Sequence, residues 1–167
     1  MTPDPSPDDR TYVEQTRDDL EECIDRSGIR RIHVLAWRDL EDPEAGGSEL
    51  HRQEVTSRWA AAGLEVCKRT SEVPGQPTTI MRDGVEVVRR AGRHQVFPRA
   101  VLAELLGRHG RRDALVEVWN GVPFLSPLWA RGPRLVIQHH DHADMWPLVL
   151  PPGPARLGSL LEHHLAP

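Results

Sequence analysis

Ile32-His33-Val34-Leu35-Ala36, followed by a loop ending in Ala45-Gly46-Gly47-Ser48-Glu49, is the stretch that decides the fold. The apolar run predicts a buried strand, and the Ala-rich segment after Ser48 predicts a helix that stops at Gly63. A second strand is predicted to begin at Leu64-Glu65-Val66. Glycines let a backbone approach a ligand, and the first N–H groups of a helix have no partner within the helix. This strand–turn–helix arrangement therefore predicts an anion or phosphate site at Gly46, Gly47 and Ser48.

The glycine spacing excludes two common phosphate loops. The chain has no G-x-G-x-x-G, which argues against a nicotinamide or flavin protein, and no G-x-x-x-x-G-K-[ST] for nucleoside triphosphates. The pattern is G-G-x-E, a helix, and then G-x-E-V. It resembles the N-terminal domain of glycosyltransferase family 4, whose enzymes have the two-domain GT-B architecture. The matching positions are Gly46, Gly47, Glu49, Val55, Trp59, Gly63, Glu65 and Val66, with Trp59 larger than the aliphatic residue expected there.

Composition bounds the class of protein. The 167 residues suffice for one domain with a core, and 38% hydrophobic with 28% charged residues is typical of a globular chain. The net charge of −4 gives no general argument for binding nucleic acid, so any basic surface has to be local. Cys23 and Cys67 stand far apart, which predicts neither a disulfide framework nor a C-x-x-C zinc or redox site. Without a signal peptide or an apolar run of bilayer length, we expect a cytoplasmic protein, with contact at a membrane surface left open.

Strand and helix patterns alternate along the rest of the chain. The sequence predicts a flexible leader over Met1–Asp9, an acidic helix over Thr11–Arg26, and a hairpin that turns at Asp83-Gly84. A helix is predicted to open at Pro98. Strands are predicted at 64–69, 79–82, 85–89, 114–119 and 134–138, and a last helix at 155–164. This order predicts an α/β domain with a mainly parallel sheet, helices on both faces and one inserted β-hairpin.

Three loops that follow strands are expected to converge on one edge of the sheet. They are Trp37–Ser48, Asn120–Pro127 and His139–Trp146. Ligands of open parallel sheets bind beyond the carboxyl ends of the strands, where the strand order reverses. Ser48 and the glycines can serve only the turn and the helix start, and Asn120 can bind a sugar hydroxyl or merely form an Asn-Gly turn. We favour the ligand role for the glycine turn and leave Asn120 open.

The third loop begins with His139-His140-Asp141-His142, with Asp144 close behind. A metal site is the minor interpretation, since adjacent residues of an extended chain point in opposite directions and no H-E-x-x-H spacing is present. In family 4 a histidine commonly follows this strand and faces the transfer site. The resemblance places His140 at that catalytic position, with His139 or His142 as substrate-binding alternatives if the register slips. A histidine that only satisfies loop backbone groups is the structural alternative.

The resemblance covers about residues 30–167. It implies a Rossmann-like domain over 29–167 that forms the acceptor half of a GT-B fold, preceded by the leader and acidic helix predicted over 1–28. The family's second domain carries most donor-binding residues, and its motifs are missing from this sequence. We therefore expect a retaining glycosyltransferase half that is inactive alone and needs the missing C-terminal donor domain. The implied partners are a nucleotide-sugar donor and a sugar or lipid-linked acceptor, with no cofactor and no metal. The alternatives are a non-catalytic sugar- or nucleotide-binding module that needs a partner chain, and a metal-dependent hydrolase using the His139–Asp144 cluster.

Overall fold

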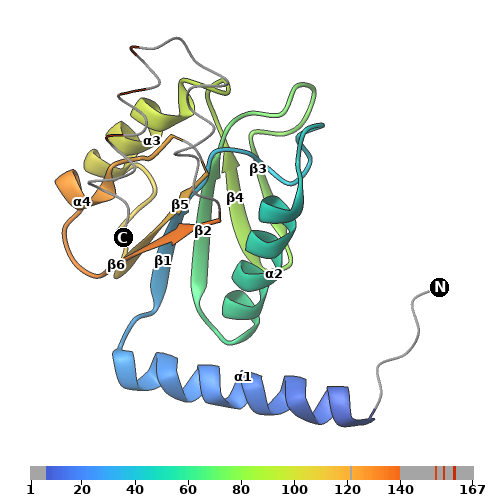
Figure 1. Ribbon diagram of the computed structural model, residues 1–167. Helices are drawn as coiled ribbons and strands as arrows, with labels where there is room; N and C mark the ends of the chain where they lie inside the picture. Colours follow the sequence, from blue (N-terminus) through green and yellow to red (C-terminus); the bar gives the residue numbers. More distant parts are fainter. Residues whose placement is uncertain (1–6, 121, 140–152, 154–155, 157–159, 161–167) are drawn as a thin grey trace.

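The computed structural model describes residues 7–120 and 122–139, together with positions 153, 156 and 160. The described strands form one six-stranded sheet with the order β3-β4-β2-β1-β5-β6 (Figure 1). The elements in chain order are α1 (Pro7–Ser27), β1 (Arg31–Leu35), α2 (Gly47–Ala61), β2 (Glu65–Thr70), β3 (Thr79–Arg82), β4 (Val85–Arg89), α3 (Val96–Leu105), β5 (Ala114–Trp119), α4 (Ser126–Trp129) and β6 (Arg134–Gln138).

All neighbouring strands pair in parallel except β3 and β4, which form an antiparallel hairpin. Asp83 and Gly84 both have positive φ, 50° and 78°, as the predicted two-residue hairpin turn requires. Gly63 has φ of 94° just past α2, where the sequence predicted the helix to stop. The predicted α/β fold with a mainly parallel sheet and one inserted hairpin is confirmed.

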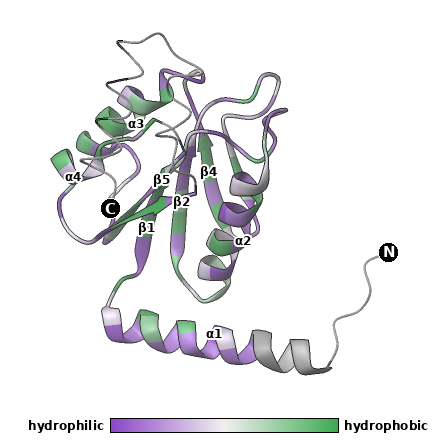
Figure 2. Ribbon diagram, in the orientation of Figure 1, coloured by the Kyte–Doolittle hydropathy of each residue, from purple (hydrophilic) through white to green (hydrophobic). Residues whose placement is uncertain are grey.

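Helices cover both faces of the sheet, and the central strands β1, β2 and β5 are accordingly buried along nearly their whole length. On one face, Ile32 and Val34 of β1 belong to an apolar core that Leu20 of α1 and Trp59 of α2 help to close. On the other face, Leu35 packs in a second cluster that includes side chains of α3 and α4. Figure 2 shows both hydrophobic and hydrophilic residues along the strands of the sheet. Trp59, Trp119 and Trp129 are core residues.

Two helix starts and one additional helix differ from the sequence prediction. Helix α1 begins at Pro7, inside the segment expected to be a flexible leader. Helix α3 begins at Val96, so Pro98 lies in its first turn rather than opening it. The short helix α4 was not predicted at all. The helix predicted over 155–164 falls outside the continuous described ranges.

The sheet reverses its order between β1 and β5. From β1 the chain passes through α2 on one face to β2, and from β4 it passes through α3 on the other face to β5. The loops after β1 and β5 therefore leave the carboxyl edge in different directions, and we call the place between them the crevice, after the usual ligand position in sheets of this kind. This crevice is the switch point at which the sequence predicted a site.

Candidate functional site

The turn before α2 lies at the carboxyl end of β1, as predicted. Gly46 is the N-cap of α2, and its carbonyl oxygen accepts hydrogen bonds from the N–H groups of Glu49 and Leu50. The Glu49 side chain folds back, and its Oε2 accepts the Gly46 N–H at 2.8 Å. This is the acidic half of a capping box, which stabilises the start of the helix. The geometry matches the interpretation of Glu49 as a helix-stabilising residue.

Two backbone donors at this helix start have no acceptor among the described residues. They are the N–H groups of Gly47 and Ser48. Gly46 has no side chain with which to cap them. A Cβ added to Gly47 would meet no atom of the described residues within 4 Å. The turn thus presents free N–H groups at the positive end of a helix dipole, which is an arrangement that can receive an anion.

Asn120, at the end of β5, reaches the same turn across the crevice. Its Nδ2 donates a hydrogen bond to Ser48 Oγ at 3.2 Å. Ser48 Oγ in turn donates to Glu49 Oε2 at 3.0 Å. The convergence of the first two predicted loops is therefore confirmed. It places a hydroxyl, an amide and two free N–H groups at one point of the carboxyl edge.

Glu117 holds the loop that follows Asn120. The side chain lies on β5, is 1% exposed, and accepts backbone N–H groups from Phe124, Leu125 and Ser126 at 2.5, 3.2 and 2.8 Å. These bonds fix the loop after β5 and the first turn of α4. Leu125 adopts a left-handed backbone conformation with φ of 57° between the other two donors. Sequence reasoning missed this anchor, since a glutamate inside a strand pattern gives no sign of its loop partners.

His139 is the part of the third loop that the structure describes. Its ring packs edge-on against the ring of His51 on α2, with centroids 5.2 Å apart. This contact brings the start of the third loop to the same helix that carries the glycine turn. His140 and His142 lie outside the described residues, so their predicted roles stay predictions. Within the described ranges no three His, Cys, Asp or Glu side chains gather as metal ligands.

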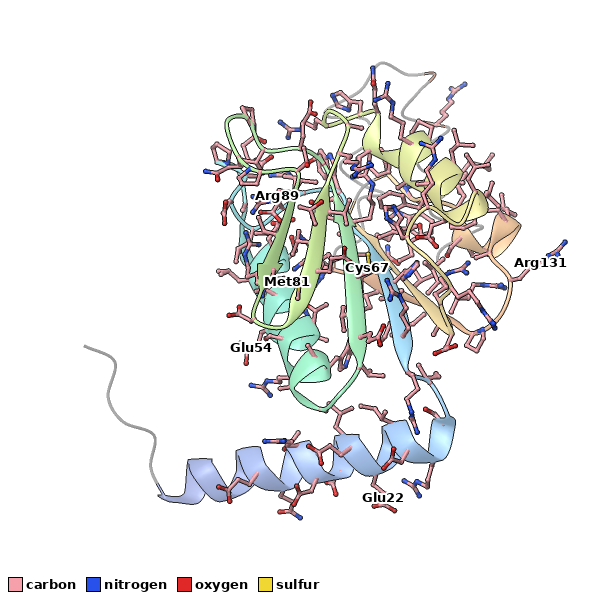
Figure 3. The ribbon with its side chains drawn as sticks, turned by 180° about the vertical axis from the view of Figure 1, so that it is seen from behind. Glu22, Glu54, Cys67, Met81, Arg89 and Arg131 are labelled. Atoms are coloured by element: carbon pink, nitrogen blue, oxygen red, sulfur yellow. The ribbon has the colours of Figure 1, made fainter. Side chains whose placement is uncertain are left out.

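A buried charge network lies behind the turn and fixes the loop after β1. Asp39 is 0% exposed, and its Oδ1 accepts from Arg89 Nη2 at 2.8 Å and from Arg82 Nη2 at 3.1 Å. Glu41 pairs with the same two arginines at 2.6 and 3.0 Å. Figure 3 labels Arg89 at the end of the hairpin beside this loop. Asp39 is therefore an internal ion-pair partner and does not face the crevice.

Opposing effects act on the Asp39 carboxyl. Burial by itself raises its pKa, but hydrogen bonds from Arg82, from the Glu41 N–H and from Arg89 outweigh burial and hold the pKa below its usual value. The carboxylate is therefore the stable form inside the fold. It ties the loop 36–46 to the β3–β4 hairpin and so positions the glycine turn that ends the loop.

Lys68, the single lysine of the chain, is buried beneath α2. Its Nζ donates to Gln53 Oε1 at 2.6 Å, and Gln53 Nε2 donates to Asp83 Oδ2 at 2.9 Å. Burial lowers the pKa of Lys68 to about 7, and the nearby Arg52 guanidinium acts in the same direction. Lys68 points to the α2 face of the sheet and not into the crevice, so its role is internal.

Trp37, the second residue after β1, has partners on two loops. The guanidinium carbons of Arg38 and Arg93 lie 4.3 and 5.0 Å from its ring centroid, and its Nε1 donates to the Arg93 carbonyl. The ring therefore makes cation–π contacts that join the loop after β1 to the loop after β4.

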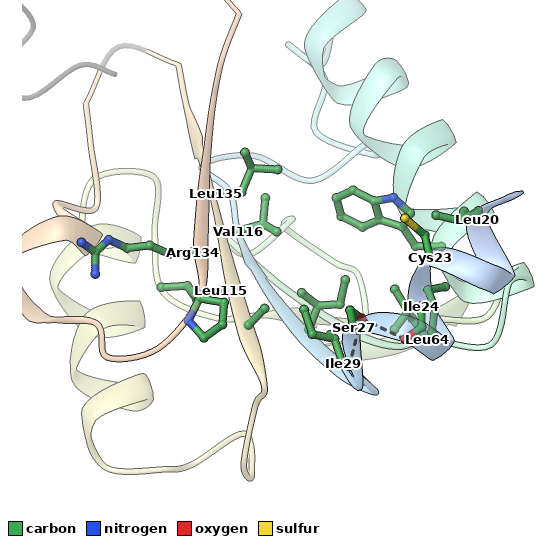
Figure 4. A pocket seen from close by; sticks show the side chains of 14 residues that line it. Leu20, Cys23, Ile24, Ser27, Ile29, Leu64, Leu115, Val116, Arg134 and Leu135 are labelled. Carbon is green, nitrogen blue, oxygen red and sulfur yellow. Dashed lines mark hydrogen bonds between the residues drawn. The ribbon is translucent and has the colours of Figure 1, made fainter.

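An apolar cavity of about 330 Å³ opens away from this edge. Figure 4 shows it between α1 and the starts of β5 and β6, lined by side chains that include Leu20, Ile24 and Leu135. It lies at the amino ends of the parallel strands, opposite the crevice. It is therefore not part of the candidate site.

The fold and the crevice define an α/β protein with an open, mainly parallel sheet and a switch point between β1 and β5. No protein-family model matches the chain, and no curated protein is similar to it at a level that shows a family. The resemblance to glycosyltransferase family 4 rests on the residues of the glycine turn and of α2, and is carried forward as a hypothesis.

Proposed function

We propose that this chain is the acceptor-side domain of a retaining glycosyltransferase of family 4, and that its crevice binds part of a nucleotide-sugar or a phosphorylated acceptor. The observation that carries the proposal is the meeting of Ser48 and Asn120 beside two free backbone donors. Sugar hydroxyls pair with hydroxyl and amide side chains, and phosphates pair with N–H groups at helix starts. The crevice offers both kinds of partner side by side.

The transfer step needs more than this crevice. A retaining transferase has to hold donor and acceptor in line and to neutralise the departing diphosphate. Here the free Gly47 and Ser48 donors supply part of the phosphate binding, and His140 is proposed to face the reacting sugar. A donor-binding domain, from the same protein or a partner chain, supplies the remaining contacts. A binding module that needs such a partner uses the same crevice and differs only in lacking turnover.

A membrane-peripheral location in the cytoplasm is part of the proposal. None of the described helices is long and apolar enough to cross a bilayer. Helix α3, however, exposes Leu102, Leu105 and Leu106, spaced as one helical face. Its acidic residue, Glu104, is turned inward against His33, while Arg99 near its start and Arg108 just past its end are exposed. Exposed leucines flanked by arginines suit an anionic lipid surface, which fits a lipid-linked acceptor.

Backbone NMR of the full chain titrated with UDP- and GDP-sugars tests the binding proposal. The Gly47 and Ser48 amides are expected to shift first, because they are the free donors of the crevice. The amide of Ala61, exposed at the far end of α2, is the internal control. Shifts confined to residues outside the crevice, or no shifts with any nucleotide-sugar, would contradict the proposal.

A further inference from the structure

The α2 start already holds an anion of its own. The Glu49 carboxylate is 3% exposed and takes the Gly46 N–H and the Ser48 hydroxyl through the same oxygen, Oε2. A phosphate bound at Gly47 and Ser48 would lie beside this carboxylate. The negative charges of the phosphate and the carboxylate would repel each other, most strongly where water is excluded. The carboxylate therefore competes with the ligand of the proposed function.

One turn along α2, Arg52 is a buried cation with one unused donor. Its side chain is 4% exposed, and its Nε has no acceptor among the described residues. Its Nη2 donates to the Arg38 carbonyl at 2.6 Å. Its Nη1 forms a loose ion pair with Glu49 Oε1 at 3.8 Å, which is beyond hydrogen-bond length. This buried guanidinium therefore offers the Glu49 carboxylate a second position, in which the ion pair would tighten into a hydrogen bond.

The two arrangements of Glu49 differ by a small movement. Shortening the Nη1–Oε1 distance from 3.8 Å to about 2.9 Å would make a charge-assisted hydrogen bond with Arg52. Turning the whole carboxylate toward Arg52, so that Oε2 also leaves its place, would free the Gly46 N–H and the Ser48 hydroxyl. The turn would then offer these two donors together with the free N–H groups of Gly47 and Ser48. That is a donor set suited to one phosphate group.

We propose that Glu49 determines the affinity of the crevice for phosphate: a phosphate-bearing ligand binds by displacing the Glu49 carboxylate from the α2 start onto Arg52. The inference rests on the proposed function, since it concerns the same crevice. It identifies the phosphate portion of the ligand as the part bound at the glycine turn. It also assigns Arg52 a role as the receiver of the displaced carboxylate, without contact to the ligand.

Calorimetric titration of the full chain with inorganic pyrophosphate tests this competition. Glu49→Gln keeps a side chain that can cap the helix but removes the charge. It is expected to tighten pyrophosphate binding about tenfold. Glu54→Gln is the matched control, because Glu54 lies on the same helix in an exposed pair with Arg58. This variant is expected to leave the affinity unchanged.

A double-mutant cycle tests whether Arg52 receives the displaced Glu49 carboxylate. Arg52→Met is expected to weaken pyrophosphate binding in the wild-type background and to have no effect in the Glu49→Gln background. Equal effects in both backgrounds would overturn the role of Arg52. If Glu49→Gln leaves the affinity for pyrophosphate unchanged or lowers it, the competition is overturned. The proposed function would still stand in that case if the chain binds a nucleotide-sugar and Gly47→Val abolishes that binding. Absence of binding to pyrophosphate and to nucleotide-sugars in every variant would overturn both.

Discussion

Asn120 Nδ2 donates to Ser48 Oγ at 3.2 Å, although 72 residues separate the two along the chain. The contact exists because β1 and β5 are neighbours in the sheet while their following loops diverge. Asn120 directly follows β5, and Ser48 lies in the first turn of α2. A ligand in the crevice would therefore touch the two halves of the sheet at once.

The buried Asp39 network is predicted to govern the stability of the loop after β1. Asp39→Asn removes the buried one of the two carboxylates that pair with Arg89, which is 1% exposed. A buried cation left with only the partly exposed Glu41 is costly, so we expect a loss of about 2–4 kcal/mol in the free energy of unfolding, measured by urea titration. Glu54→Gln breaks an exposed pair and should change it by about 0.5 kcal/mol or less. Equal losses in the two variants would contradict the account.

Lys68 is predicted to make stability rise with pH. Its pKa is about 7 in the fold against 10.5 in the unfolded chain, so between these values the unfolded state binds more protons. The free energy of unfolding should therefore increase by about 2 kcal/mol between about pH 7.5 and 9.5 through this residue. Lys68→Met removes the titrating group and should flatten that part of the profile. Urea titrations at several pH values measure both curves, and parallel curves would contradict the prediction.

The two cysteines are predicted to differ in reactivity. Burial raises the pKa of the Cys67 thiol to about 12, with the Glu86 carboxylate adding to the effect, whereas Cys23 is exposed. Since the thiolate is the reactive form, the native chain should release colour from a disulfide reagent at Cys23 alone. Cys23→Ser should then be unreactive until urea unfolds it. Rapid reaction of the native Cys23→Ser variant would show that Cys67 is accessible.

The α3 surface is predicted to bind anionic vesicles. Leu105 is 61% exposed there, and Leu105→Glu should reduce co-sedimentation with phosphatidylglycerol vesicles about tenfold through lost apolar burial and added repulsion. Leu50→Glu places the same change at a 62% exposed leucine of α2 and should have no effect. Binding should also weaken at high salt. If Leu105→Glu and Leu50→Glu co-sediment equally with the vesicles, the exposed leucines of α3 do not bind the membrane.

Local patterns predicted the strands, the hairpin and the edge at which the loops meet. The strands, the hairpin turn at Asp83-Gly84 and the helix stop at Gly63 can each be recognised from residues that are adjacent in sequence. The loops that follow the strands then meet, because the carboxyl ends of parallel strands lie at one edge of the sheet. Helix α4 escaped prediction because it is one short turn whose donors are held by Glu117, a contact across the fold. The burial of Asp39 escaped for the same reason, since its arginine partners lie on the hairpin, 43 and 50 positions along the chain.

The candidate site was predictable only in part. Gly46, Gly47, Ser48 and Asn120 were found from turn chemistry and strand order. The sequence assigned Glu49 to helix stabilisation, but it could not show that the carboxylate also takes the Ser48 hydroxyl. Nor could it show that Arg52 lies buried beside it with an unused donor. Both facts depend on side-chain directions within one packed turn.

The most direct measurement is calorimetric titration of the chain with UDP- and GDP-sugars, comparing wild type with Gly47→Val. A Cβ at Gly47 meets no atom within 4 Å in the part of the chain that the structure describes, so the variant should fold normally and obstruct only a ligand. Ala61→Val adds the same side chain at an exposed position of α2 and serves as the control. The account predicts that wild type and Ala61→Val bind a nucleotide-sugar and that Gly47→Val does not. Equal binding by all three, or binding by none, would contradict it.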